Sequence, residues 1–283
     1  MLAREYGSTG EQLSIIGFGG IMVSKVDSSE ASALVANAID RGVNYFDVAP
    51  TYGNAQEMLG PALAPYRDDV FLACKTTERT ADGARAELQA SLKWMQTDRF
   101  DLYQMHALNT DEDFATATGP GGALEVFLEA KEKGQVRYLG FSSHSAETAL
   151  RLIEAVGFDS VLFPINWSTW LGAGFGPQVV AAAEAKGMAR LALKGMAYGK
   201  LEEGAERKWS KCWYQPIEDP ALAELALRFT LSQPVTAALP PGEPDFYPMA
   251  LDIADRYTAV SEEEIAELQR LTAQSTPIFE LAA

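Results

Sequence analysis

Cysteine and histidine are scarce in this sequence. Its 283 residues include two cysteines, Cys74 and Cys212, and two histidines, His106 and His144. A chain of this length with so few cysteines does not carry a disulfide framework, so we expect free thiols in a reducing compartment. The thiols and imidazoles are also too dispersed to match a metal-ligand motif, so we expect no bound metal.

Long apolar runs and an excess of positive charge are also missing. No stretch approaches the roughly 18 apolar residues of a membrane-spanning helix, and the first residues lack the apolar core of a signal peptide. The formal net charge is −16, from 39 acidic and 23 basic side chains, which disfavours binding to nucleic acids and anionic membranes. We therefore expect a cytoplasmic protein that acts on a small molecule, with no nucleic-acid or membrane partner.

Short apolar segments alternate with amphipathic stretches along the whole chain. Strands are predicted near residues 13–17, 44–47, 70–74, 101–105, 137–141, 159–163, 188–193 and 235–239. Continuous apolar runs such as 70–74 are typical of parallel strands that are covered by helices on both faces. Helices are predicted between them, near residues 29–41, 80–95, 122–132, 145–156, 176–186 and 220–232.

Eight strand units without a Pro- or Ser-rich linker predict one closed barrel. A (β/α)8 TIM barrel needs about 250 residues as a single unit, which fits this length. We therefore expect an α/β fold with one domain over residues 1–283. The acidic stretch 260–271 has a capping serine and apolar spacing for an extra C-terminal helix outside the barrel.

Three consecutive predicted strands end in a side chain capable of proton chemistry. Asp47, Lys75 and His106 stand at these ends, and Tyr52 lies in the loop after the first of them. Barrel enzymes carry their active groups at the carboxyl ends of strands, so the sequence predicts that these side chains meet. Cys74 precedes Lys75 and is expected to point away from it into packing.

These residue types in one place fit proton transfer to a carbonyl oxygen. Tyrosine ordinarily has a pKa of about 10, and a nearby cation such as Lys75 lowers that value. Asp47 would keep Lys75 charged and oriented. His106 would donate a hydrogen bond to the carbonyl oxygen and hold it against Tyr52.

Three segments resemble signatures of the aldo-keto reductase family. Residues 42–53 resemble its first signature, and residues 101–106 and 136–144 resemble its patterns for the fourth and fifth barrel strands. The resemblance covers nearly the whole chain and implies a catalytic tetrad of Asp47, Tyr52, Lys75 and His106. It implies NADP(H) or NAD(H) as cofactor, with hydride transfer to an aldehyde, ketone or sugar carbonyl while Tyr52 supplies the proton. The reverse direction oxidises an alcohol.

The resemblance also implies cofactor contacts on the barrel rim. Ser142 and Ser143 occupy the family's Ser-Asn positions for the nicotinamide carboxamide, so Ser143 is a departure with a shorter reach. Glycines in these loops let the backbone approach phosphate oxygens, and lysines offset the acidic background. The expected cofactor contacts are Gly19, Gly20, Ser142, Ser143, Asn166, Lys194, Met196, Gly199, Lys200, Gly242 and Glu243.

The segment after the last strand departs from the family pattern. The family places a cation for the 2′-phosphate there, whereas this chain has Glu243 after Pro-Pro-Gly242. A carboxylate repels a phosphate and can accept a ribose hydroxyl instead. The sequence therefore predicts a weakened preference for NADP.

Aromatic residues follow the sixth and seventh predicted strands. We expect Trp167, Trp170 and Trp213 to line the substrate pocket, although packing in the core explains them equally well. His144 is expected to be a hydrogen-bonded loop residue without a chemical role.

Two other functions are compatible with the sequence. A redox-neutral isomerase or lyase could keep the tetrad while losing cofactor affinity, and the altered segment at Glu243 favours it. A binding or regulatory subunit is the third alternative, but an intact tetrad argues against it. No feature of the sequence indicates an oligomeric state or one particular substrate.

Overall fold

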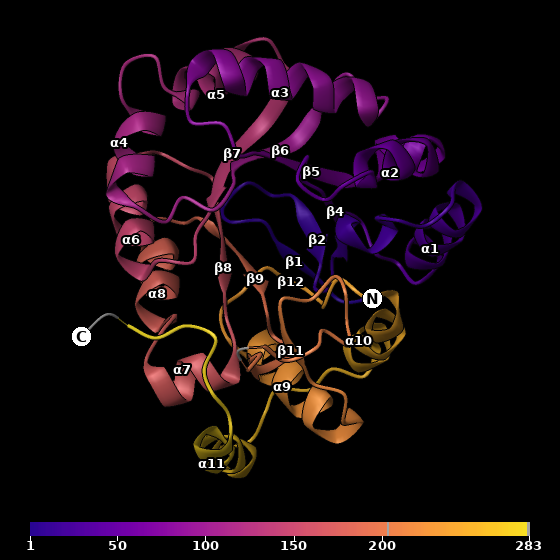
Figure 1. The fold of residues 1–283 in the computed structure, drawn as a ribbon, viewed down its shortest axis with the longest axis vertical. Helices are drawn as coiled ribbons and strands as arrows, with labels where there is room; N and C mark the ends of the chain where they lie inside the picture. Colours follow the sequence, from indigo (N-terminus) through magenta and orange to yellow (C-terminus); the bar gives the residue numbers. More distant parts are fainter. Residues whose placement is uncertain (203, 282–283) are drawn as a thin grey trace.

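Eight parallel strands form the centre of the computed structural model, which describes residues 1–202 and 204–281 (Figure 1). Each strand pairs with its neighbours in chain order, and the sheet closes where Gly17 N–H donates to the carbonyl of Ala238 at 3.0 Å. This is the expected (β/α)8 TIM barrel. Its strands are β3 (Phe18–Gly19), β4 (Tyr45–Asp47), β5 (Phe71–Thr76), β6 (Phe100–Met105), β7 (Val136–Ser142), β8 (Ser160–Pro164), β9 (Ala189–Leu193) and β12 (Ala237–Leu239).

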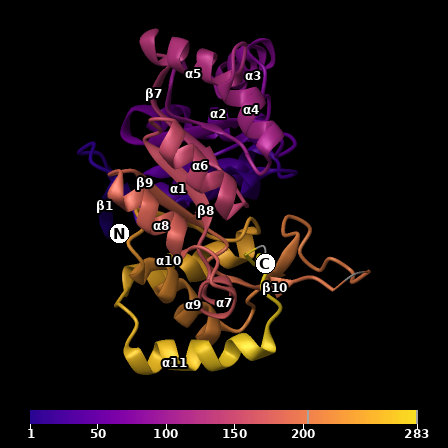
Figure 2. The same cartoon turned by 90° about the vertical axis from the view of Figure 1, so that its left-hand side faces the viewer.

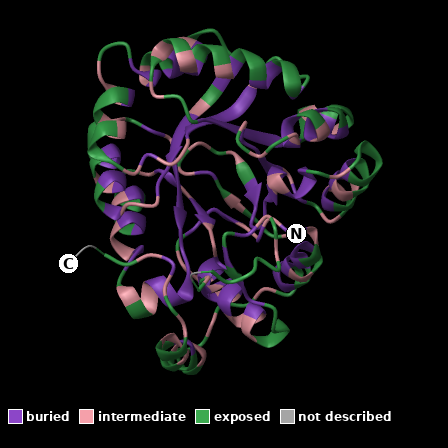
Figure 3. Cartoon of the chain, viewed as in Figure 1, coloured by how far each residue is buried: buried purple, intermediate pink, exposed green. Residues whose placement is uncertain are grey.

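Helices surround the barrel and face it with their apolar sides. Figure 3 shows buried residues in the strands and on the inner sides of the helices, and exposed residues on the outer sides. Polar side chains cap several helix starts, as where Thr80 accepts the N–H of Gly83. The helices predicted from the sequence are α1 (Ser28–Asp40), α3 (Ala81–Trp94), α5 (Ala123–Glu132), α6 (Ala146–Ala155), α8 (Pro177–Ala185) and α9 (Pro220–Ser232).

The extra C-terminal helix is α11 (Glu262–Leu271). It begins with a capping box in which the Ser261 hydroxyl accepts the N–H of Glu264 and the Glu264 carboxylate accepts the N–H of Ser261. Figure 2 shows α11 lying along the outside of the molecule, below α9. The chain then turns back, and residues 275–281 run toward the barrel mouth, where Lys200 N–H donates to the carbonyl of Thr276 at 2.9 Å.

The prediction of the first strand, residues 13–17, was right only at its end: Ile16 forms a parallel bridge with Ala238 of β12, and Ala238 N–H donates to the carbonyl of Ile15 at 2.8 Å. Residues 12–14 form β2 (Gln12–Ser14), which pairs antiparallel with β1 (Ala3–Glu5), and the barrel strand itself is β3. The apolar residues of this hairpin fill the barrel floor: Tyr6 and Leu13 are fully buried, and the Tyr6 ring lies 4.9 Å from that of Phe71. Residues buried inside the barrel and residues of the barrel strands are both apolar, so the sequence does not distinguish them.

Several elements between the strands were not predicted. In α2 (Ala55–Leu63), Gly60 and Pro61 argue against a helix, yet Gly60 lets the helix pack closely on the end of α3. A Cβ at Gly60 would lie 2.5 Å from the carbonyl oxygen of Trp94. The other unpredicted elements are α4 (Asp111–Thr118), α7 (Trp167–Ala173), α10 (Tyr247–Asp255), β10 (Ala197–Lys200), β11 (Tyr214–Pro216) and the 3-10 helices η1 (Gly20–Val23), η2 (Ala64–Asp69), η3 (Pro244–Phe246) and η4 (Thr272–Gln274).

The alternation of side chains along the strands determines what faces the barrel interior. In β5, Phe71 and Ala73 belong to the apolar cluster inside the barrel, and Lys75 follows on the same face. The same period places polar groups above the apolar floor on β4 and β6. The interior therefore changes from apolar to polar toward the carboxyl ends of the strands. In the described part of the chain, no helix is long and apolar enough to cross a membrane.

Candidate active site

A buried ion pair lies at the top of the barrel interior. Lys75 on β5 donates from Nζ to Oδ1 of Asp47 on the adjacent strand β4, and the two side chains are 0% and 1% exposed. The other oxygen, Oδ2, accepts from Nε2 of Gln104 at 2.9 Å and from the hydroxyl of Tyr45 at 3.3 Å. Buried charges need such compensation. Burial is the largest single effect on the pKa of Lys75 and lowers it, but the charge and hydrogen bond of Asp47, together with Tyr52 and Cys74, raise the pKa above its ordinary value.

Tyr52 lies directly above this ion pair. The Nζ of Lys75 is 5.6 Å from the centre of the Tyr52 ring, and the ring of His106 lies edge-on at 6.1 Å. Burial raises the pKa of Tyr52 above 10, and the charge of Lys75 opposes this rise without cancelling it. Lys75 lowers the pKa of Tyr52, as expected, but burial is the larger effect, so the net change is upward. Tyr52 is therefore protonated at neutral pH and can donate its proton.

His106 faces the same space from the end of β6. Its backbone is held at both ends: the N–H donates to the carbonyl of Thr76 at 2.8 Å, and its carbonyl accepts from Nη2 of Arg79 at 2.8 Å. Burial and the nearby charge of Lys75 lower the pKa of His106 to about 3. The imidazole is neutral at physiological pH, and its buried Nδ1 has no hydrogen-bond partner among the described residues. It can therefore bind a carbonyl oxygen but cannot serve as the main proton donor.

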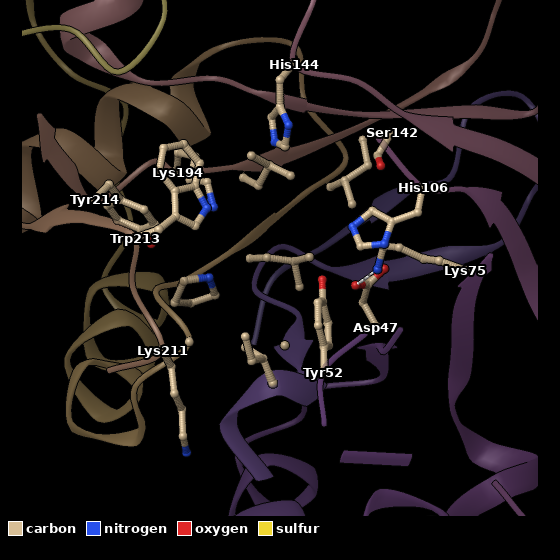
Figure 4. Close-up of a pocket in the computed structure, with 17 residues that line it drawn as sticks. Asp47, Tyr52, Lys75, His106, Ser142, His144, Lys194, Lys211, Trp213 and Tyr214 are labelled. Atoms are coloured by element: carbon tan, nitrogen blue, oxygen red, sulfur yellow. Dashed lines mark hydrogen bonds and ion pairs between the residues drawn. The ribbon is translucent and has the colours of Figure 1, made fainter. Parts of the chain in front are cut away.

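These side chains line one cavity of about 190 Å³ at the mouth of the barrel (Figure 4). Tyr52 and His106 point into it from one side, and Lys194, Trp213 and Tyr214 lie on the opposite side. The residues lining it are Gly19, Ile21, Asp47, Tyr52, Lys75, His106, Ser142, His144, Leu162, Leu193, Lys194, Lys211, Trp213, Tyr214, Leu239, Pro240 and Gly242.

Lys194, at the end of β9, is held by its backbone and by two aromatic rings. Its φ is 69°, a left-handed conformation that is uncommon for residues with a side chain. Asn166 donates from Nδ2 to the carbonyl of Lys194 at 2.9 Å. The ammonium lies 4.9 Å from the ring centre of Trp213 and 4.6 Å from that of Tyr214. Burial lowers the pKa of Lys194 to about 8.

Two of the expected carboxamide contacts are occupied by the protein itself. The Ser143 hydroxyl donates to the carbonyl of Leu108 at 2.6 Å, and the side chain is fully buried. The amide of Asn166 donates to two carbonyls and accepts two N–H groups at the start of α7. Ser142 differs from them, because it lines the cavity and its Oγ accepts the N–H of Ala107 at 2.8 Å. Its own hydroxyl proton has no acceptor among the described hydrogen bonds.

Other expected contacts lie outside the cavity lining. Lys200 is exposed on β10, with Nζ 3.9 Å from Glu280, and a Cβ at Gly199 would approach the carbonyl oxygen of Thr276 to 2.6 Å. Glu243 is buried and accepts the backbone N–H of Lys211 at 2.5 Å. Among the expected residues, those that do not line the cavity are Gly20, Ser143, Asn166, Met196, Gly199, Lys200, Glu243, Trp167 and Trp170.

The three tryptophans expected at the pocket separate into two groups. Trp213 lines the cavity. Trp167 is fully buried and donates from Nε1 to the carbonyl of Ala197 at 3.2 Å, and Trp170 packs edge-on against Phe229 at 6.3 Å. In this conformation, packing explains Trp167 and Trp170.

Several functional positions were missed by the sequence reasoning. Gln104 and Tyr45, which hydrogen-bond Asp47, lie two residues before His106 and Asp47 on the same strand faces, so strand periodicity could have indicated them. His144 also lines the cavity, with its ring stacked at 5.1 Å on Phe279 of the C-terminal segment. Lys211 reaches the cavity from the loop before β11, and Tyr214 from the start of β11, two segments for which the sequence offers no periodic signal.

Cys74 lies on the opposite face of β5 from Lys75, as expected. Its Sγ is 3.3 Å from Nε2 of Gln56, and burial raises the pKa of its thiol to about 12. In residues 1–202 and 204–281, no cluster of three or more His, Cys, Asp or Glu side chains could hold a metal ion.

Comparison with known proteins gives one consistent result. A model described as "Aldo/keto reductase family" matches residues 15–243. The uncharacterized oxidoreductase YqkF of Bacillus subtilis is 27% identical, over 97% of this chain and 97% of its own length. L-galactose dehydrogenase of Arabidopsis thaliana is 26% identical, over 73% of this chain and 69% of its own length.

Solved structures share the fold. The holo form of aldo-keto reductase AKR11C1 from Bacillus halodurans matches with a TM-score of 0.75 and 22% identity, over 96% of each chain. A putative aldo-keto reductase from Pseudomonas aeruginosa matches with a TM-score of 0.73 and 24% identity, over 90% of this chain and 96% of that one. At such low identity the likeness establishes the barrel and leaves the substrate open.

Proposed function

This chain belongs to the aldo/keto reductase family of oxidoreductases, and we propose that it reduces the carbonyl group of an aldehyde, ketone or sugar with Tyr52 as the proton donor. The proposal rests on the arrangement of four polar side chains at the barrel mouth. A protonated Tyr52 lies above the buried ion pair of Lys75 and Asp47, and a neutral His106 faces it across the same cavity.

Each residue of the tetrad has one role in this reaction. His106 donates a hydrogen bond that holds the carbonyl oxygen near the Tyr52 hydroxyl, and its low pKa keeps it neutral while doing so. Tyr52 gives its proton to this oxygen as negative charge develops there. Lys75 stabilises the resulting phenolate, because its charge favours the ionised form of the tyrosine. Asp47, held by Gln104 and Tyr45, fixes the position of Lys75.

A nicotinamide cofactor would supply the hydride to the carbonyl carbon. The rim of the cavity fits such a group in part: the Ser142 hydroxyl has a proton to donate to a carboxamide oxygen, and Gly19 and Gly242 leave backbone accessible at the cavity wall. A Cβ at Gly19 would meet open space, so nothing there obstructs a ligand.

The segment after β12 supports comparable binding of the two nucleotides. Glu243 is buried against the loop that carries Lys211, so its negative charge stays close to the barrel rim. We expect dissociation constants for NADPH and NADH within about tenfold of each other, a difference of about 1.4 kcal/mol. NADPH binding tighter by about a hundredfold or more would contradict this expectation.

The test is hydride transfer by the purified protein, followed by loss of nucleotide absorbance with a panel of aldehydes, ketones and sugars. The Tyr52→Phe variant removes only the phenolic hydroxyl, and we expect its turnover to fall by about 10²–10⁴-fold, the usual contribution of a general acid. Its affinity for the nucleotide should stay unchanged. The matched control is Tyr66→Phe, a tyrosine of η2 that does not line the cavity.

The same experiment distinguishes a reductase from the alternative function, a redox-neutral isomerase or lyase. Folded wild-type protein, free of retained cofactor, that binds neither NADPH nor NADH would favour it. Turnover that persists undiminished in Tyr52→Phe would refute the assignment of the proton donor while leaving the reductase activity in place.

A further inference from the structure

The cavity carries more positive charge than the proposed reaction uses. Four charged residues line it, Asp47, Lys75, Lys194 and Lys211, in a chain whose formal net charge is −16. Asp47 neutralises Lys75, and the ammonium of Lys211 donates to the carbonyl of Met22 at 2.7 Å. Lys194 has no ion-pair partner among the described salt bridges. Lys211 also lacks a partner among these salt bridges, but its ammonium is hydrogen-bonded to a backbone carbonyl, whereas the described contacts of the Lys194 ammonium are aromatic rings.

The local structure holds Lys194 in place at some energetic cost. A left-handed backbone conformation costs about 1 kcal/mol or more for a residue with a side chain, and it persists where the surroundings enforce it. The buried amide of Asn166 provides this enforcement through the carbonyl of Lys194. The aromatic faces of Trp213 and Tyr214 then hold the ammonium at the cavity wall.

The charge of Lys194 acts on the part of the cavity that faces Tyr52 and His106. Lys194 lies across the cavity from Tyr52 and His106 (Figure 4), and its charge contributes to the low pKa values of His106 and His144. A molecule whose carbonyl is bound by Tyr52 and His106 would extend across the cavity toward Lys194.

We propose that Lys194 binds a carboxylate at the far end of the carbonyl substrate, so that the enzyme prefers oxo acids to the corresponding neutral compounds. This inference rests on the proposed reductase function and assigns a substrate class to it. Lys194 lines the same cavity as Tyr52 and His106, and one ammonium matches the single charge of a carboxylate. A phosphate monoester carries about 1.5 to 2 negative charges and would leave charge uncompensated beside neutral histidines.

The competing ligand for Lys194 is the pyrophosphate of the cofactor, near which the sequence reasoning placed this lysine. The two assignments predict different effects when Lys194 is replaced by a neutral residue. A pyrophosphate contact affects the dissociation constant of the nucleotide, whereas a carboxylate contact affects the choice between charged and uncharged substrates at saturating nucleotide.

The test uses straight-chain oxo acids of increasing length, each paired with its own primary amide, which has the same shape without the charge. Values of kcat/KM are measured for wild type, Lys194→Met and Lys194→Arg, together with nucleotide dissociation constants. Lys186→Met is the matched control, because Lys186 pairs with Glu154 on the outer surface. For one chain length we expect wild type to prefer the acid by about ten- to hundredfold, as for a hydrogen bond to a charged group.

Loss of this preference in Lys194→Met, with retention in Lys194→Arg and an unchanged nucleotide dissociation constant, would support the proposal. A preference that survives in Lys194→Met, or no preference in wild type at any chain length, would overturn it. Weaker nucleotide binding by Lys194→Met without a change in preference would assign Lys194 to the pyrophosphate and overturn it as well.

A binding measurement separates this proposal from failure of the reductase function itself. Dicarboxylates of the same lengths, which carry no carbonyl to reduce, are titrated against the intrinsic tryptophan fluorescence of the protein, because Trp213 lies against Lys194. Saturable binding that is lost in Lys194→Met supports the carboxylate site even if no carbonyl compound turns over. Absence of binding to the wild type overturns the site even if neutral carbonyls are reduced.

Discussion

The two sides of the cavity are built in different ways. On one side, Asp47 and Lys75 stand on adjacent strands, are 1% and 0% exposed, and are held by hydrogen bonds from neighbouring strand residues. On the other side, Lys194 follows a strand end and is held by Trp213 and Tyr214, which belong to a long loop and to β11. Trp213 is 43% exposed. The first side gains rigidity from the barrel, and the second depends on connecting segments.

The difference suggests a division of labour within one cavity. Strand ends in a closed barrel cannot shift independently, so they suit groups that must be fixed for proton transfer. Loops can vary in length and sequence without disturbing the barrel, so they suit contacts that select the substrate. Changes on the strand side should therefore be more damaging than changes on the loop side.

The buried ion pair should be the most sensitive point. Asp47→Asn leaves the ammonium of Lys75 buried without its partner, and breaking such a pair costs about 3–5 kcal/mol of folding stability. Urea unfolding monitored by fluorescence would measure this loss of stability. The double variant Asp47→Asn/Lys75→Met removes both charges and should recover part of the loss. A single variant as stable as the wild type would show that this side is less rigid than the geometry indicates.

Gln104 should matter less, because it supports Asp47 through one hydrogen bond. Gln104→Leu removes the donor to Oδ2, and losing a hydrogen bond to a charged group costs about 1.5–3 kcal/mol. We expect kcat to fall with little change in the nucleotide dissociation constant. The conservative variant Gln104→Asn gives a control with the same amide group on a shorter side chain. An unchanged kcat in Gln104→Leu would mean that Tyr45 and Lys75 suffice to hold Asp47.

On the loop side, pH should act through Lys194. It is cationic below its pKa of about 8 and neutral above it, so kcat/KM for an acidic substrate should fall as pH rises through about 8. Of the other titratable groups that line the cavity, burial keeps His106 and His144 neutral and raises the pKa values of Tyr52 and Tyr214, but it lowers the pKa of Lys211. A decrease that persists in Lys194→Arg would therefore be assigned to Lys211.

The size of this pH effect is set by the loss of one proton from Lys194. Between pH 7 and 9, the cationic fraction of such a group changes by about tenfold, equivalent to about 1.4 kcal/mol. Lys194→Arg stays charged and should give a flat profile, as should a neutral substrate with wild type. A decrease of equal size for acidic and neutral substrates would point to a titrating group in the tetrad instead.

The smallest effect is expected at the aromatic surface under Lys194. Trp213→Leu removes a partly exposed cation–π contact, for which about 0.5–1 kcal/mol is typical. KM for an acidic substrate should rise a few-fold while kcat stays near its wild-type value, and steady-state kinetics would show it. A large fall in kcat would mean that the loop side also positions the reacting groups.

The residue pattern was enough to predict the barrel, the family and the four side chains that meet at the barrel mouth. Charged residues at the ends of regularly spaced apolar strands report which groups share the barrel rim, because strand periodicity and closure leave them no other place. The sequence placed the start of the first barrel strand too early, because Leu13, buried in the barrel floor, is as apolar as a residue of the barrel wall.

The electrostatics and the shape of the cavity depend on the packing of segments that are far apart in the chain. The raised pKa of Tyr52 depends on how far burial outweighs Lys75, and no local pattern contains that balance. The occupation of Asn166 and Ser143 by backbone groups, and the approach of Trp213 and Tyr214 to Lys194, depend on contacts between segments far apart in the chain. Local sequence fixes which side chains a strand end presents, but burial and the charges of distant neighbours determine what those side chains can do.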